Sequence, residues 1–199
     1  MSAFLLRLVS ILSTLGIMTA SYASVLVSID APSLNGTPAQ LAFDFVDGGS
    51  PANTVSLSAF STDAALGSNS ITGAVTGSLS GTLSFADTPF FSEYRQNLTL
   101  GSHISFRIDD SGGAADAGSF PDGFSVFLLD PVTSLPLVTT SDPTGAHALL
   151  LVNIGSDPHV EAFKSNTVTV TVPEPSAATF IGILIAVLTP IVLRARAKR

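Results

Sequence analysis

Apolar and polar residues alternate one for one along short stretches in the middle of this chain. Residues 41–45 read Leu-Ala-Phe-Asp-Phe, residues 104–108 read Ile-Ser-Phe-Arg-Ile, and residues 168–172 read Val-Thr-Val-Thr-Val. Successive side chains of a β-strand point to opposite faces, so this period of two places one apolar face on each segment. No helical period of 3.6 residues persists along the body. The sequence therefore predicts a body made of β-strands.

The remaining strand candidates are short β-branched or aromatic runs separated by turn residues. They cover residues 25–29, 55–60, 71–79, 82–85, 94–100, 124–129 and 148–154. Roughly ten strands in one domain favour an all-β fold, an antiparallel β-sandwich of jelly-roll-like form. Residues 124–129 and 148–154 are apolar on both faces, as expected of central strands that are covered on both sides. The alternative is a parallel β-solenoid, suggested by glycines at four-residue spacing in 73–81, but a bent hairpin fits that segment better because no longer period exists.

The first 23 residues have the pattern of a signal peptide. Arg7 precedes an apolar run over residues 8–18, and small residues stand at Ser21 and Ala23. Small residues at these two positions suit signal peptidase, so we expect a cleavable signal helix that is cut between Ala23 and Ser24. The alternative is an uncleaved membrane anchor, for which the apolar run is short.

The other end of the chain carries three features in a fixed order. Pro173, Glu174 and Pro175 precede an apolar run over residues 177–193. Those 17 residues would form a helix of about 25 Å, near the lower limit for crossing a bilayer core of about 30 Å. We therefore expect a transmembrane helix that acts as a temporary stop-transfer element, with a permanent anchor as the alternative. The basic tail that should stay in the cytoplasm consists of Arg194, Arg196, Lys198 and Arg199.

These C-terminal features together resemble the PEP-CTERM sorting signal of Gram-negative bacteria. The resemblance implies that exosortase, an integral membrane enzyme, recognises residues 173–199 and processes the protein near the Pro-Glu-Pro motif. It further implies a precursor held transiently in the inner membrane, and a product at the cell surface or in an extracellular polysaccharide matrix. The chain then divides into a signal peptide (1–23), a β-sandwich ectodomain (24–172) and a sorting signal (173–199).

Charge and cysteine content exclude several functions for the body. Residues 24–172 contain 14 Asp and Glu residues against 3 basic residues, a formal charge of −11. Such a surface repels phosphate backbones, which argues against nucleic-acid binding. The chain has no cysteine, which excludes disulfides, thiolate metal sites and cysteine nucleophiles.

The segment 109–123 gathers acidic residues between glycines, which is the chemistry that calcium prefers. Its carboxylates are Asp109, Asp110, Asp116 and Asp122. A solvated acidic loop is the alternative, because the spacing matches no known calcium motif. Asp122-Gly123 before the apolar strand 124–129 resembles a motif of L-type lectin sandwiches, which implies that Asp122 contacts sugar hydroxyls. A turn aspartate that opens a core strand is the other interpretation.

Nothing in the sequence matches a catalytic motif. The patterns of α/β-hydrolases, zinc proteases and P-loop enzymes are missing, and His103, His147 and His159 stand in three separate segments. We therefore expect a non-enzymatic surface or extracellular-matrix protein. The alternative is a carbohydrate- or calcium-binding lectin-like module, and calcium is the one candidate cofactor.

Overall fold

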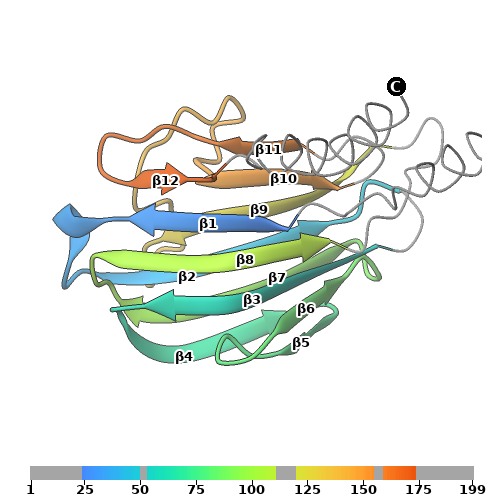
Figure 1. The fold of residues 1–199 in the computed structure, drawn as a ribbon, viewed down its shortest axis with the longest axis horizontal. Coiled ribbons are helices and arrows are strands. Elements are labelled where there is room, and N and C mark those ends of the chain that lie inside the picture. The colour runs from blue at the N-terminus through green and yellow to red at the C-terminus, as the bar shows by residue number, and fades with distance from the viewer. Residues whose placement is uncertain (1–23, 50–52, 111–119, 155–158, 174–199) are drawn as a thin grey trace, which may run out of the picture.

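The computed structural model describes residues 24–49, 53–110, 120–154 and 159–173, which form two six-stranded antiparallel sheets lying face to face (Figure 1). A short 3-10 helix, η1 (Pro32–Leu34), links β1 to β2. The predicted all-β antiparallel sandwich is confirmed. In spatial order, the first sheet, sheet A, contains β12 (Thr169–Thr171), β1 (Val25–Asp30), β8 (His103–Asp110), β3 (Thr54–Thr62), β6 (Leu83–Ala86) and β5 (Val75–Gly77). Sheet B contains β11 (His159–Ala162), β10 (Leu150–Ile154), β9 (Asp122–Leu129), β2 (Pro38–Val46), β7 (Phe91–Thr99) and β4 (Ala65–Thr72).

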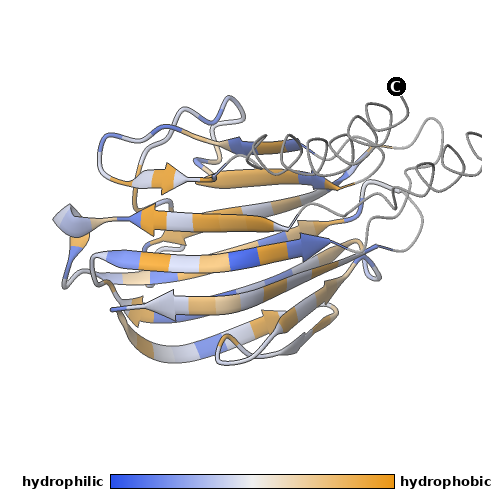
Figure 2. Ribbon diagram, in the orientation of Figure 1, coloured by the Kyte–Doolittle hydropathy of each residue, from blue (hydrophilic) through white to orange (hydrophobic). Residues whose placement is uncertain are grey.

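The core lies between the sheets and is built from the alternating apolar residues. Along β8, the three apolar residues of 104–108 are buried, and Figure 2 shows hydrophobic and hydrophilic residues alternating along this strand. Phe43 of sheet B meets Phe106 of sheet A edge to face, with ring centroids 5.4 Å apart. Phe85 of sheet A and Phe124 of sheet B are 5.3 Å apart. Aromatic contacts of this kind add to the free energy of simple burial and fix how the two sheets sit on each other.

The segment 71–79 differs from the single strand that the sequence predicts. β4 ends at Thr72 in sheet B, and the chain crosses to sheet A to form β5. Gly73 makes the crossing with φ +72°, and a Cβ placed there would lie 2.3 Å from the carbonyl oxygen of Phe91. Only glycine tolerates both conditions. The bent hairpin expected over the glycines is confirmed, because β5 pairs with β6 in antiparallel register.

Two edge strands escaped the sequence prediction. β11 and the first half of β4 consist mainly of exposed residues, so they show no buried face in the sequence. Strands at sheet edges need only one hydrogen-bonded neighbour, and their pairing comes from that neighbour. The alternation of apolar and polar residues therefore could not predict these two strands.

The outer face of sheet B is partly covered around β9 and β10. The segment 130–149 crosses this face, with Leu129 and Leu149 both buried and the Leu137 N–H donating to the Leu128 carbonyl at 2.8 Å. A recess of about 210 Å³ remains, with Phe127 among its lining residues. The two-sided burial expected of these strands is met only in part: Phe127 and Leu151 on the outer face are half-buried beside a long connection.

β1 begins toward the right of Figure 1, the side of the sandwich that we call the terminal end, and β12 runs in the direction of the same end. Val25, the first residue of β1, pairs with Ile108, near the end of β8. Thr171, the last residue of β12, pairs with Ser28. Ser24 and Pro173 therefore follow from neighbouring strands, and both are exposed. The terminal end also carries the described connecting residues 47–49, 53, 87–90 and 120–121.

No helix of the described residues is long and apolar enough to cross a membrane. The predicted signal helix (1–23) and transmembrane segment (177–193) lie outside the described residues.

Candidate functional site

Three aspartates from distant parts of the chain meet at the terminal end. Asp47 directly follows β2, Asp87 directly follows β6, and Asp122 opens β9. One carboxylate oxygen from each lies within 4.8 Å of the others. Asp122 is fully buried and Asp87 is 5% exposed. Because β6 belongs to sheet A and the other two strands to sheet B, the aspartate cluster bridges the two sheets.

Asn53 organises this cluster from the start of β3. Its side-chain Nδ2 donates to Asp122 Oδ2 at 2.7 Å, and its backbone N–H donates to the carboxylate of Asp87. The Gly48 N–H donates to Asp122 Oδ1 at 2.7 Å. Asn53 is itself fully buried. Hydrogen bonds to buried carboxylates are among the stronger ones in proteins, so this network also ties the ends of the sheets together.

The cluster has the chemistry of a site for a hard divalent cation. Two full negative charges at 4.8 Å, the upper limit for these oxygens, would repel each other by about 3 kcal/mol at an effective dielectric constant of about 20. Calcium and magnesium bind carboxylate and carbonyl oxygens, and calcium accepts irregular arrangements of six to eight such ligands. The aspartate cluster can therefore act as a hydrogen-bonded tie between the sheets or as the protein part of a calcium site.

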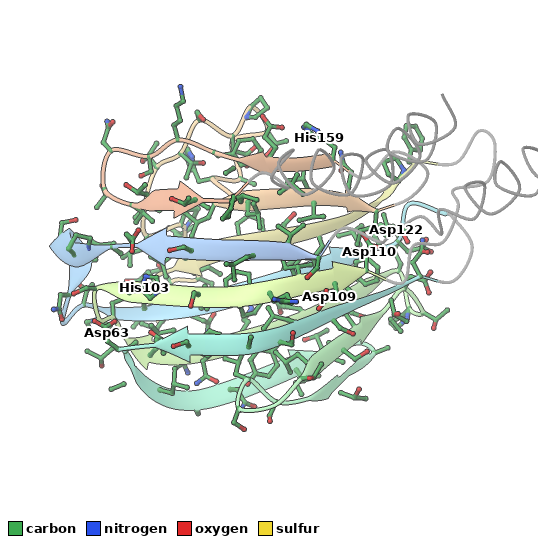
Figure 3. The ribbon with its side chains drawn as sticks, viewed as in Figure 1. Asp63, His103, Asp109, Asp110, Asp122 and His159 are labelled. Carbon is green, nitrogen blue, oxygen red and sulfur yellow. The ribbon has the colours of Figure 1, made fainter. Side chains whose placement is uncertain are left out.

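Of the four carboxylates that the sequence singled out as metal ligands, the structure brings only Asp122 into the cluster. Asp109 and Asp110 are the last two residues of β8, and neither belongs to the group, although Asp110 lies at the same end of the sandwich as Asp122 (Figure 3). Asp116 lies outside the described residues.

Asp47 and Asp87 were missed as ligands. Each of the two aspartates stands directly after a strand. An aspartate at the end of a strand is common in turns, so position alone does not distinguish a ligand. What gathers them is the pairing of strands far apart in sequence, which a single sequence does not display.

The predicted sorting and processing residues fall at or beyond the limits of the described chain. Ser24 and Pro173 are described and exposed. The other named positions lie outside the described residues, namely Ala23, Glu174, Pro175, Arg194, Arg196, Lys198 and Arg199.

The three histidines stay apart. His103 Nδ1 lies 2.9 Å from Asp30 Oδ1 at the end of the sandwich opposite the cluster, and His159 opens β11 (Figure 3). His147 Nδ1 accepts the Thr140 N–H at 3.3 Å. None of the three belongs to the aspartate cluster.

A second acidic group lies on the outer face of sheet B. Asp44 of β2 pairs directly with Glu93 of β7. Burial, and then the neighbouring Glu93 carboxylate, raise the pKa of Asp44 to about 7. Arg95 Nε donates to Glu93 Oε1 at 2.6 Å, which balances one of the two charges. Asp44 is therefore expected to be partly protonated near neutral pH. The contact with Arg95 holds the Glu93 side chain in place on the sheet.

A scan against protein-family models, a search of curated proteins and a search of solved structures found no match. Function is therefore inferred from the residues themselves.

Proposed function

We propose that this chain is an exported, non-enzymatic protein of the cell surface or extracellular matrix of a Gram-negative bacterium. Signal peptidase removes residues 1–23, and an exosortase-type system processes the tail beginning at Pro173. The observation that carries the proposal is the order of the two address segments around one folded body: a signal peptide before it, and a Pro-Glu-Pro motif, an apolar run and basic residues after it.

The geometry of the body supports this proposal. Ser24 precedes β1 and Pro173 follows β12, the neighbouring strand, so both address segments connect to the same edge of sheet A. The folded core can then stay intact while either segment is cut. Consecutive strands from β1 to β4 alternate between the two sheets, which supports the finer jelly-roll-like description.

Several polar side chains outside the cluster have structural tasks that suit a non-enzymatic scaffold. Asp142, for example, accepts the backbone N–H groups of Thr144 and Ala148 at 2.9 and 3.0 Å. Ser92 accepts the Ala74 N–H and donates to the Ala86 carbonyl, both at 3.0 Å. Such contacts stabilise turns and strand ends.

The proposal is tested on protein recovered from its own host. N-terminal sequencing of the exported form should begin at Ser24, and its intact mass should lack the basic tail that ends at Arg199. Exported protein that still begins at Met1 and ends at Arg199 would contradict the proposal.

The second candidate function is a calcium-binding, lectin-like module. Convergence of Asp47, Asp87 and Asp122 from three segments favours it, because calcium sites in proteins are assembled from several oxygen ligands in this manner. Asp122, the residue that the lectin resemblance implicates, is one of the three. A bound cation would then set the shape of the loops at the terminal end, where an extracellular ligand could be recognised.

A further inference from the structure

Two phenylalanines at the terminal end are exposed, in contrast to those of the core. Phe90 is 68% exposed and Phe120 is 78% exposed, whereas Phe43, Phe85 and Phe106 are fully buried. Phe90 directly precedes β7, and Phe120 stands two residues before β9. Single exposed apolar residues are ordinary, but two large rings on adjoining loops of one end form a surface that water solvates poorly.

These two loops are held together by the segment between β2 and β3. The Asp47 N–H donates to the Phe90 carbonyl at 2.9 Å. A Cβ placed on the next residue, Gly48, would lie 2.4 Å from the Phe120 carbonyl oxygen, so the backbones touch there. The Gly48 N–H in turn is bonded to the buried Asp122. Phe90 and Phe120 are therefore carried on one hydrogen-bonded platform.

The chain leaves this same end toward the apolar run. Pro173 stands two residues after β12, which runs toward the terminal end, and the apolar run begins at Ala177. Four residue steps span at most about 14 Å, because an extended chain advances no more than about 3.6 Å per residue. Whenever residues 177–193 lie in a bilayer, Pro173 must therefore lie within about 14 Å of the membrane, and β12 points the terminal end toward it.

We propose that Phe90 and Phe120 form a membrane-contact surface that seats the precursor on the bilayer by its terminal end. The inference rests on the proposed function, because it requires the C-terminal segment to be inserted. Aromatic rings are favoured in the interfacial region of a membrane. The aspartate cluster and the strongly acidic body oppose anionic headgroups, so the partner is a zwitterionic surface whose ammonium groups complement the carboxylates, such as phosphatidylethanolamine.

The chain contains no tryptophan, so each single substitution to tryptophan gives one fluorescent reporter. The test uses Phe90→Trp and Phe120→Trp in the full chain, reconstituted into phosphatidylethanolamine vesicles whose acyl chains carry bromine. The matched control is Val132→Trp, because Val132 is 89% exposed and follows the far end of β9. Phe180→Trp, inside the apolar run, reports insertion of the tail. Thermal unfolding of each variant verifies that the exposed substitutions leave the fold intact.

The inference predicts loss of emission in brominated vesicles for Phe90→Trp, Phe120→Trp and Phe180→Trp, with Val132→Trp unchanged. If Phe180→Trp alone is quenched, the tail is inserted as proposed but the contact surface does not exist. If Phe180→Trp is not quenched either, both the inserted precursor and the contact surface are contradicted. The emission of Phe90→Trp and Phe120→Trp could instead change with the protein-to-lipid ratio and be the same with and without bromine. That result would identify a second copy of the chain as the partner and overturn the membrane assignment.

Discussion

At the terminal end the carboxylates of three aspartates from three segments converge, whereas at the opposite end Asp63 and Asp130 each accept backbone N–H groups of loops. Asp63 accepts the backbone N–H groups of Ser102 and His103, both at 2.9 Å. Asp130 accepts those of Val132 and Thr133 at 3.0 and 2.7 Å. These backbone donors hold the pKa of both carboxyls below the usual range.

The two ends therefore differ in what surrounds their carboxylates. At the opposite end the carboxylates accept backbone N–H groups, whereas at the terminal end they lie close enough to repel one another or to bind a cation. Asp63 and Asp130 lie near solvent and accept backbone N–H groups, Asp130 from the turn that follows it and Asp63 from the start of β8 and the residue before it. Asp47, Asp87 and Asp122 lie within 4.8 Å of one another and two of them are buried, so their arrangement depends on Asn53 and on the packing of both sheets. Changes at the two ends should therefore have unequal effects.

The largest effect is expected from Asn53→Ala, compared with Asp130→Ala at the opposite end. Asn53→Ala removes the side-chain donor to the buried Asp122, and should lower the free energy of unfolding by about 3 kcal/mol. Asp130→Ala removes turn contacts near solvent, so its loss of stability should be clearly smaller. Urea unfolding of both variants measures the difference. Equal losses would show that the terminal end has no special network.

Calcium should stabilise the terminal end selectively. A site occupied at a hundred times its dissociation constant adds about 2.7 kcal/mol, which corresponds to a rise in Tm of roughly 5–10 °C for a body of this size. The rise should disappear in Asp122→Asn and persist in Asp130→Asn. Magnesium at matched ionic strength is the control for screening. If calcium and magnesium raise Tm by the same small amount, the cluster is no calcium site and only links the two sheets through hydrogen bonds.

Gly48→Ala and Gly36→Ala compare backbone approach at the two ends. A Cβ on Gly48 would lie 2.3 Å from the Pro121 carbonyl oxygen, so Gly48→Ala should cost about 2 kcal/mol and loosen the Phe120 loop. At Gly36 an added Cβ would meet no atom within 4 Å, but the backbone has φ +82°. Gly36→Ala should therefore lower the free energy of unfolding by only about 1 kcal/mol, through its backbone conformation. Thermal unfolding ranks the two variants. A larger loss for Gly36→Ala would contradict the close approach.

The smallest effect concerns Asp44, which belongs to neither end. Its pKa in the folded protein, about 7, lies above the ordinary value of 3.8, so the folded state holds a proton that the unfolded state has lost. The free energy of unfolding should therefore fall as pH rises from about 4 to about 7, by about 1–2 kcal/mol after allowance for partial exposure. Asp44→Asn should flatten this slope. The test is the free energy of unfolding of the wild type and of Asp44→Asn, measured from about pH 4 to about pH 7. If the slope is the same in both proteins, Asp44 is not the source of the pH dependence.

The sequence predicted those parts of the fold that depend on local alternation. Ile104, Phe106 and Ile108 indicated a strand and its buried face, and all three are buried in β8. The crossing at Gly73 could not be predicted, because glycine is compatible with both a bend within a strand and a change of sheet.

The candidate site was only partly accessible from sequence. Asp122 was identified because it precedes an apolar strand. Asp47 and Asp87 were not, because their approach to Asp122 depends on two strand pairings and on the packing of sheet A against sheet B. Residues that meet across a sandwich carry no spacing signal along the chain.

The account as a whole depends on the tail that leaves the terminal end, and Glu174→Ala in the native host tests it most directly. The matched control is Glu161→Ala, which removes an exposed glutamate from β11. Intact masses of inner-membrane and exported fractions are compared for the wild type and both variants. The wild type and Glu161→Ala should be exported without the tail, whereas Glu174→Ala should accumulate in the inner membrane as a precursor that ends at Arg199. Identical masses for all three proteins, each ending at Arg199, would contradict the account.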